Sequence, residues 1–124
     1  MLRVSLAGVV RTCVAHGPIL RAIYEAVPFD GRMEAAWRRF MGGWDDAVAA
    51  RAELQQRDGR IPPSLDARRV ARALNAMNAA VLIAEFGHRP QGDPDAVLDA
   101  LHRIWEGALY GQAPGEEADE ETMT

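Results

Sequence analysis

Two asparagines stand one helical turn apart in the apolar stretch ALNAMNAAVL, which runs from Ala73 to Leu82: they are Asn75 and Asn78. An amide side chain carries hydrogen-bond donors and an acceptor, and burying it without partners costs about 1–3 kcal/mol. Residues three apart on a helix share a face. Two explanations are open: the amides line a ligand pocket, or they fix the register of packed or paired helices.

A row of large apolar side chains is the second candidate feature. One long segment carries Trp37, Phe40, Met41 and Trp44 at helical spacing, and Trp105 lies in another apolar stripe nearer the C-terminus. Core packing explains such a stripe, but a pocket for an apolar ligand is lined by the same residue types together with a few polar groups. The two amides would supply those polar groups.

Catalytic and metal chemistry are not indicated by the sequence. The three histidines lie far apart, and no HxxxH or Cys/His pair has the spacing of a metal site. No phosphate-binding glycine loop or GxSxG motif is present, and the adjacent acids Asp45 and Asp46 point apart on a helix. Cys13, the single cysteine, has no identifiable base, so we expect a small buried hydrophobe. We therefore expect no enzyme activity, no metal and no cofactor.

Charge is distributed unevenly along the 124 residues. The net charge of −4 comes from an acidic C-terminus that carries Glu116, Glu117, Asp119, Glu120 and Glu121. We expect residues 1–111 to form one domain and residues 112–124 to be a disordered acidic tail. Neither part is basic enough to bind nucleic acid by itself. The single cysteine and an apolar N-terminal run too short to span a bilayer predict a cytoplasmic protein without membrane association.

Every long periodic segment has helical spacing, which predicts an all-α fold. Five helices are expected, over residues 2–16, 18–27, 33–58, 64–86 and 94–110. Ser64 is the expected N-cap of the fourth helix and Asp93 that of the fifth, which Gly111 closes. Gly42 and Gly43 interrupt the third helix and predict a bend or a close neighbour there.

Three motifs, in order, carry a resemblance to a known family. They are WxxFMxxW at 37–44, ALNAMN at 73–78 and HRIWEGALYG at 102–111. Together they resemble the C-terminal domain of TetR-family transcriptional repressors, in particular the subgroup typified by the mycobacterial ethionamide-resistance regulator EthR. The likeness runs from about Gly17 to Gly111.

The resemblance implies a regulatory domain that senses a small hydrophobic effector in an elongated pocket. It also implies a homodimer in which the last two helices, 64–86 and 94–110, form a four-helix bundle. Carried over by position, the ligand-binding residues would be Trp37, Phe40, Met41, Trp44, Asn75, Asn78, Leu82 and Trp105. The two amides would then form the polar end of an apolar pocket.

The resemblance does not extend to the whole family pattern. We expect this chain to lack the family's N-terminal helix-turn-helix domain and connecting helix, so that DNA is a partner only where such a domain is supplied elsewhere. One side of the pocket would then lack its cover. Two alternatives stay open beside the effector-sensing domain: a structural helical dimerisation module, and a mixed-dimer partner of a full-length repressor.

Overall fold

The computed structural model describes residues 1–111 and is all-helical over that range, which confirms the predicted fold class. Its elements are α1 (Leu2–Ala26), the 3-10 turn η1 (Val27–Phe29), α2 (Gly31–Arg57), α3 (Ala67–Phe86) and α4 (Pro94–Tyr110). The first two expected helices are joined at a kink at His16 and are counted together as the element α1, so the predicted number of five helices is not confirmed. The predicted acidic tail, residues 112–124, lies outside the described residues.

The bend in α1 explains why the sequence suggested two helices there. His16 has non-helical backbone angles (φ −122°, ψ 16°). Pro18 has no N–H, so the carbonyl of Val14 loses its donor within the helix. The side chain of Gln91 replaces that donor: its Nε2 donates to the carbonyl oxygens of Val14 and Phe86, each at 3.0 Å. The loop before α4 therefore holds the bend.

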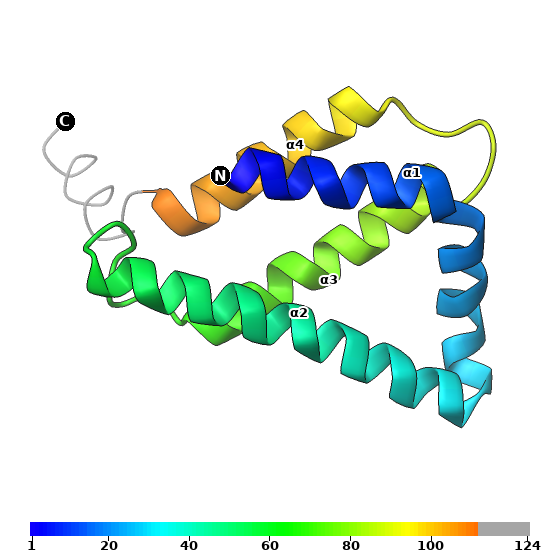
Figure 1. Ribbon diagram of the computed structural model, residues 1–124, viewed down its shortest axis with the longest axis horizontal. Helices are drawn as coiled ribbons and strands as arrows, with labels where there is room; N and C mark the ends of the chain where they lie inside the picture. The colour runs from blue at the N-terminus through cyan, green and yellow to red at the C-terminus, as the bar shows by residue number, and fades with distance from the viewer. Residues whose placement is uncertain (112–124) are drawn as a thin grey trace, which may run out of the picture.

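Figure 1 shows α3 crossing the molecule diagonally, and α3 packs against each of α1, α2 and α4. The first half of α1 lies beside α4, and α2 runs along the opposite side of the molecule. The second half of α1 descends from the bend and meets α2 at the corner that η1 forms. The central position of α3 means that its side chains decide how the other helices are placed.

Aspartates cap three of the helices. Asp30, Asp66 and Asp93 each accept a hydrogen bond from a backbone N–H in the first turn of the helix that follows. The predicted cap at Asp93 is confirmed. The predicted cap at Ser64 is wrong by two residues, because the extended backbone of Asp66 places its carboxylate 3.1 Å from the N–H of Arg69.

The core is built mainly by α1, α3 and α4, and α2 contributes small side chains. The large buried members are Leu6, Val10, Ile61, Leu74, Leu82, Phe86, Val97, Leu98, Leu101, Trp105 and Leu109. From α2, Ala49 and Ala52 are buried, whereas Phe40 and Trp44 are 52% and 43% exposed. Small side chains at a helix contact allow the two axes to approach closely. The aromatic stripe of α2 is therefore not part of the core.

The N-terminal element α1 consists of two helical parts joined at the kink at His16. The segment Leu2–Phe29 is long and apolar enough to cross a membrane by length and composition. This is weak evidence for a membrane span, since a core helix passes the same test. Here Leu6 and Val10 lie in the core that α1 shares with α3 and α4.

Gly17, at the bend, generates the first prediction. A Cβ added there would lie 1.9 Å from the carbonyl oxygen of Phe86 and 2.6 Å from its carbonyl carbon. Backbone atoms at the end of α3 cannot move aside as a flexible side chain would. We expect Gly17→Ala to lower the free energy of unfolding by about 1–3 kcal/mol, measured by urea denaturation followed by circular dichroism.

Gly43→Ala is the matched control. A Cβ added at Gly42 or Gly43 meets no atom within 4 Å, so the predicted close neighbour of this pair is not found. In the middle of a helix, alanine is favoured over glycine by about 1 kcal/mol, and Gly43→Ala should raise stability. Unchanged stability in Gly17→Ala would contradict the close approach of the bend to α3.

Candidate functional site

Four aromatic rings form a continuous strip where the second half of α1 meets α2. This aromatic row consists of Tyr24 from α1 and Trp37, Phe40 and Trp44 from α2. Successive ring centroids lie 5.4, 5.7 and 6.4 Å apart, and the first and last pairs meet edge to face. Aromatic pairs prefer this geometry. Contiguous exposed apolar surface of this kind marks a place where a ligand or a partner binds.

The two asparagines of α3 are buried, and each has a partner on a different helix. The Oδ1 of Asn78 accepts from the indole Nε1 of Trp105 at 2.9 Å, which joins α3 to α4. The Nδ2 of Asn75 donates to the Oδ1 of Asp45 at 2.9 Å, which joins α3 to α2. Within the described part of the chain, no buried side-chain nitrogen or oxygen lacks a partner. In this structure, hydrogen bonds to other side chains of the protein therefore offset the cost of burying the two amides.

The structure separates the predicted site residues into two groups. The group at the α2 surface is Trp37, Phe40, Met41 and Trp44. The group buried between α3 and α4 is Asn78, Leu82 and Trp105. Asn75 lies between the two groups and is connected to α2 through Asp45. That all eight residues contact one ligand stays a prediction.

Asp45 is a site residue that did not stand out in the sequence. The adjacent acids do point apart: Asp46 is exposed and forms an ion pair with Arg68, whereas Asp45 is half-buried against Asn75. The signal was present in the spacing, since Asp45 stands four residues after Met41 and therefore continues its line along the helix. The half-buried carboxylate of Asp45 contacts α3 through Asn75.

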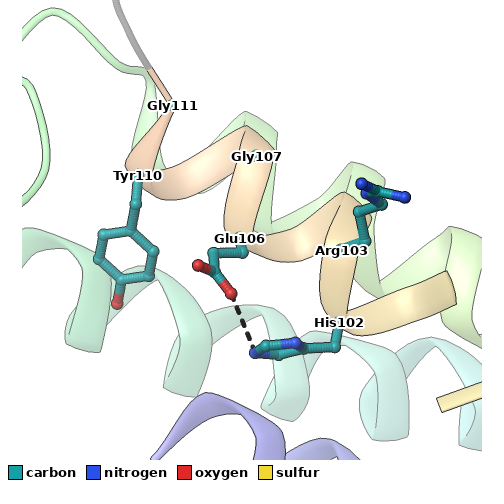
Figure 2. A pocket seen from close by; sticks show the side chains of 6 residues that line it. All are labelled: His102, Arg103, Glu106, Gly107, Tyr110 and Gly111. Atoms are coloured by element: carbon teal, nitrogen blue, oxygen red, sulfur yellow. Dashed lines mark ion pairs between the residues drawn. The ribbon is translucent and has the colours of Figure 1, made fainter. Parts of the chain in front are cut away.

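Two open hollows lie on α4, away from the aromatic row. Figure 2 shows the first, of about 410 Å³, where Nε2 of His102 lies 3.1 Å from Oε2 of Glu106. The second, of about 240 Å³, lies between α3 and α4 and is lined by Val81, Glu85, Asp93, Ala96, Val97 and Ala100. None of the eight predicted residues lines either hollow.

The described residues offer little for nucleophilic or metal chemistry. No group of three or more His, Cys, Asp or Glu side chains within residues 1–111 lies close enough to hold a metal ion. Cys13 is half-buried and packs against the core, and burial raises the pKa of its thiol. A raised pKa disfavours the thiolate, which is the reactive form. Cys13 therefore serves to pack against the core.

The fold and the site define an all-helical domain with buried amides on its central helix and an exposed aromatic row. Residues 2–111 match the family described as "Transcriptional regulator EthR, C-terminal domain", and the chain belongs to this family. The resemblance drawn from the three motifs is therefore confirmed at the level of the family.

Curated relatives agree with the family match. The chain is 32% identical over 113 residues to the HTH-type transcriptional regulator EthR of Mycobacterium tuberculosis (strains CDC 1551 / Oshkosh and H37Rv) and of Mycobacterium bovis. The match covers 90% of this chain and 52% of each relative, so the chain spans about half the length of the curated relatives it matches. These relatives are named as transcriptional regulators.

The Asn78–Trp105 hydrogen bond generates the second prediction. Asn78→Ala leaves the buried indole N–H without an acceptor, which should lower the free energy of unfolding by about 1–3 kcal/mol. Chemical denaturation measures the loss, and the near-ultraviolet circular dichroism of Trp105 should weaken with it.

A double-mutant cycle isolates the bond from the packing. In a Trp105→Phe background the indole N–H is absent, so Asn78→Ala should cost less there than in the parent protein. Equal costs in both backgrounds would show that the hydrogen bond does not couple the two residues.

Proposed function

We propose that the chain is the effector-sensing, dimerising regulatory domain of a TetR-like transcriptional repressor, and that it binds a small hydrophobic ligand along the aromatic row. The observation that carries the proposal is the exposure of that row: Phe40 and Trp44 are 52% and 43% exposed although they contact other rings. Covering this apolar surface with a ligand is favourable. The names of the relatives support the regulatory role and a cytoplasmic location.

The proposed ligand lies on Trp37, Phe40, Met41 and Trp44, with its polar end near Asn75. Met41 is half-buried one turn after Trp37 and continues the same apolar surface. A ligand that extends along α3 from Asn75 would reach Asn78, Leu82 and Trp105, the remaining residues that the resemblance assigns to the site. The binding surface thus starts on α2 and ends on α3.

Ligand contact on α2 has a physical route to the rest of the domain. Asp45–Asn75 joins α2 to α3, and Asn78–Trp105 joins α3 to α4. A ligand that prefers one arrangement of these helices shifts the population toward it. A coupling free energy of about 1–3 kcal/mol is typical of such systems. In a repressor that carries a DNA-reading domain, the shift would change the spacing of the two recognition helices in the dimer.

The proposed dimer interface is formed by α3 and α4. Their exposed faces carry small or apolar side chains, namely Ala76, Ala80 and Ala84 on α3 and Ala96, Ala100, Ile104 and Ala108 on α4. Such faces let two helices approach closely, as in a four-helix bundle. The hydrogen bonds that connect the ligand site to the rest of the domain end on these same two helices. Ligand binding and the geometry of the dimer would therefore be linked.

A structural dimerisation module that binds no ligand is the second candidate. One observation favours it: both amides already have partners within the chain, as register-fixing polar residues do. A mixed dimer with a full-length repressor would use the same α3–α4 face. Either candidate predicts an intact dimer whose aromatic row binds no small molecule.

Ligand binding is the third prediction. N-phenylnaphthylamine, an uncharged apolar fluorophore, should bind and accept excitation energy from the tryptophans. Phe40→Ala removes an exposed ring of the row and should weaken binding about five-fold, which corresponds to about 1 kcal/mol. Fluorescence titration measures both affinities.

Leu54→Ala is the matched control for that titration. Leu54 is on the same helix and is 54% exposed, but it lies outside the aromatic row. Its replacement should leave the affinity of the probe unchanged. Equal weakening by both variants, or no binding to the parent protein, would argue for the structural module instead.

Dimerisation is the fourth prediction. Ala100→Glu places a charge on the exposed face of α4 and should convert the dimer to a monomer, because burying an unpaired carboxylate is costly. Sedimentation equilibrium measures the change. Ala50→Glu, at an exposed position of α2, should leave the dimer intact. A monomeric parent protein, or the same loss in both variants, would contradict the proposed interface.

A further inference from the structure

The segment 18–47 lies outside the core of the domain. It contains the second half of α1, η1 and the first half of α2, which meet at a corner in Figure 1. Among the described residues, the buried positions nearest to this segment are Gly17 before it and Ala49 after it. The partly buried apolar side chains that pack against the core include none from the segment. A segment that buries so little can move without disrupting the core.

The part of this segment before the glycine pair, residues 18–41, is held together by its own contacts. We call it the arm. Its two helical limbs are joined by the ring pair of Tyr24 and Trp37, whose centroids lie 5.4 Å apart. Within the described part of the chain, the side-chain hydrogen bonds and ion pairs of the arm are internal. They are Arg21–Glu25, Arg38–Glu34 and the cap that Asp30 forms on α2.

The arm begins at a point that is anchored to α3. His16 departs from helical backbone angles, and Pro18 removes one N–H donor from the helix. Gly17 is buried against the end of α3, since a Cβ added there would lie 1.9 Å from the carbonyl oxygen of Phe86. The second half of α1 therefore projects from a fixed bend.

The arm ends at a glycine pair. Gly42 and Gly43 follow one another in the interior of α2, where glycine weakens a helix. A Cβ added at either position would meet no atom within 4 Å, so close packing does not explain the pair. Immediately beyond it, Nδ2 of Asn75 donates to Oδ1 of Asp45 at 2.9 Å. Thus α2 is weakest where the arm ends and is attached to α3 directly afterwards.

We propose that the arm moves as a unit relative to the core, with hinges at the bend in α1 and at the glycine pair. The aromatic row crosses the second hinge, because Phe40 lies on the arm and Trp44 lies beyond the glycines. Their ring centroids are 6.4 Å apart. A ligand that covers both rings favours one position of the arm and holds it there. This last step rests on the proposed function, whereas the movement of the arm does not.

Electron–electron distance measurements between two nitroxide labels test the movement. The labels are placed by Phe29→Cys, at the exposed tip of the arm, and Arg72→Cys, on the exposed face of α3, in a Cys13→Ala background. The reference pair is Arg57→Cys with Arg72→Cys, because Arg57 lies on the anchored half of α2. We expect the distance distribution of the first pair to be about twice as wide as that of the reference pair. An excess of unlabelled chain removes distances between protomers, and unfolding curves confirm that each variant is folded.

Gly42→Ala together with Gly43→Ala should stiffen the second hinge. Alanine favours the helix and meets no neighbour at these positions, so the distribution of the arm pair should narrow to the width of the reference pair. Gly8→Ala is the control: it adds a Cβ inside α1 but outside the arm, 3.8 Å from the end of the Arg11 side chain. This variant should leave both widths unchanged. The probe N-phenylnaphthylamine should narrow the arm pair in the parent protein.

The outcomes separate the arm from the proposed function. An arm pair as narrow as the reference pair, or one that the alanines at the glycine pair do not narrow, overturns the hinged arm and leaves the ligand site standing. If the probe binds by fluorescence but the arm pair stays wide, the ligand does not hold the arm, and that step is wrong. A wide arm pair in a protein that binds no probe supports the arm and overturns the proposed ligand site.

Discussion

Two amides buried on one helix are the constraint on which the rest of this structure depends. Asn75 and Asn78 lie on α3. Each needs a hydrogen-bond partner, because the free-energy cost of an unpaired buried amide is a large fraction of the free energy of unfolding of a small domain. Asp45 supplies the partner on α2 and Trp105 the partner on α4. The two bonds point to opposite neighbours, so they set the position of α2 and α4 relative to α3.

The same constraint exposes the aromatic row. To bring Asp45 to Asn75, α2 turns its line of small residues, with Ala49 and Ala52, toward α3. The bulky side of α2 is then left at the surface, where Phe40 and Trp44 contact each other and the solvent. Covering an apolar surface of this kind is energetically favourable. Packing and proposed function thus have one origin, the orientation of α2.

Much of the fold followed from the sequence, because periodicity and caps are local. The all-α class, the break near Gly17 and the start of α4 at Asp93 were all predicted from neighbouring residues. The contact that holds the kink in α1 was not predicted, because Gln91, which donates to the carbonyl of Val14, is distant in sequence. For α2, the sequence pattern singled out the face with the largest apolar side chains as the candidate packing or ligand-binding face. In the structure, the face with the smallest side chains packs against α3 instead. The role of Asp45 was also missed, because its partner Asn75 is distant in sequence and the two residues meet only in the folded structure.

The most direct test of this account is a ¹H–¹⁵N spectrum of the three tryptophan indoles during titration with an apolar probe. The account predicts that the Trp105 indole N–H, bonded to Asn78, exchanges slowly with solvent in the domain before the probe is added. The indole signals of Trp37 and Trp44 should shift together as the probe covers the aromatic row. A probe that shifts Trp105 and leaves Trp37 and Trp44 unmoved would contradict the account, because the amides would then face the ligand and the aromatic row would not.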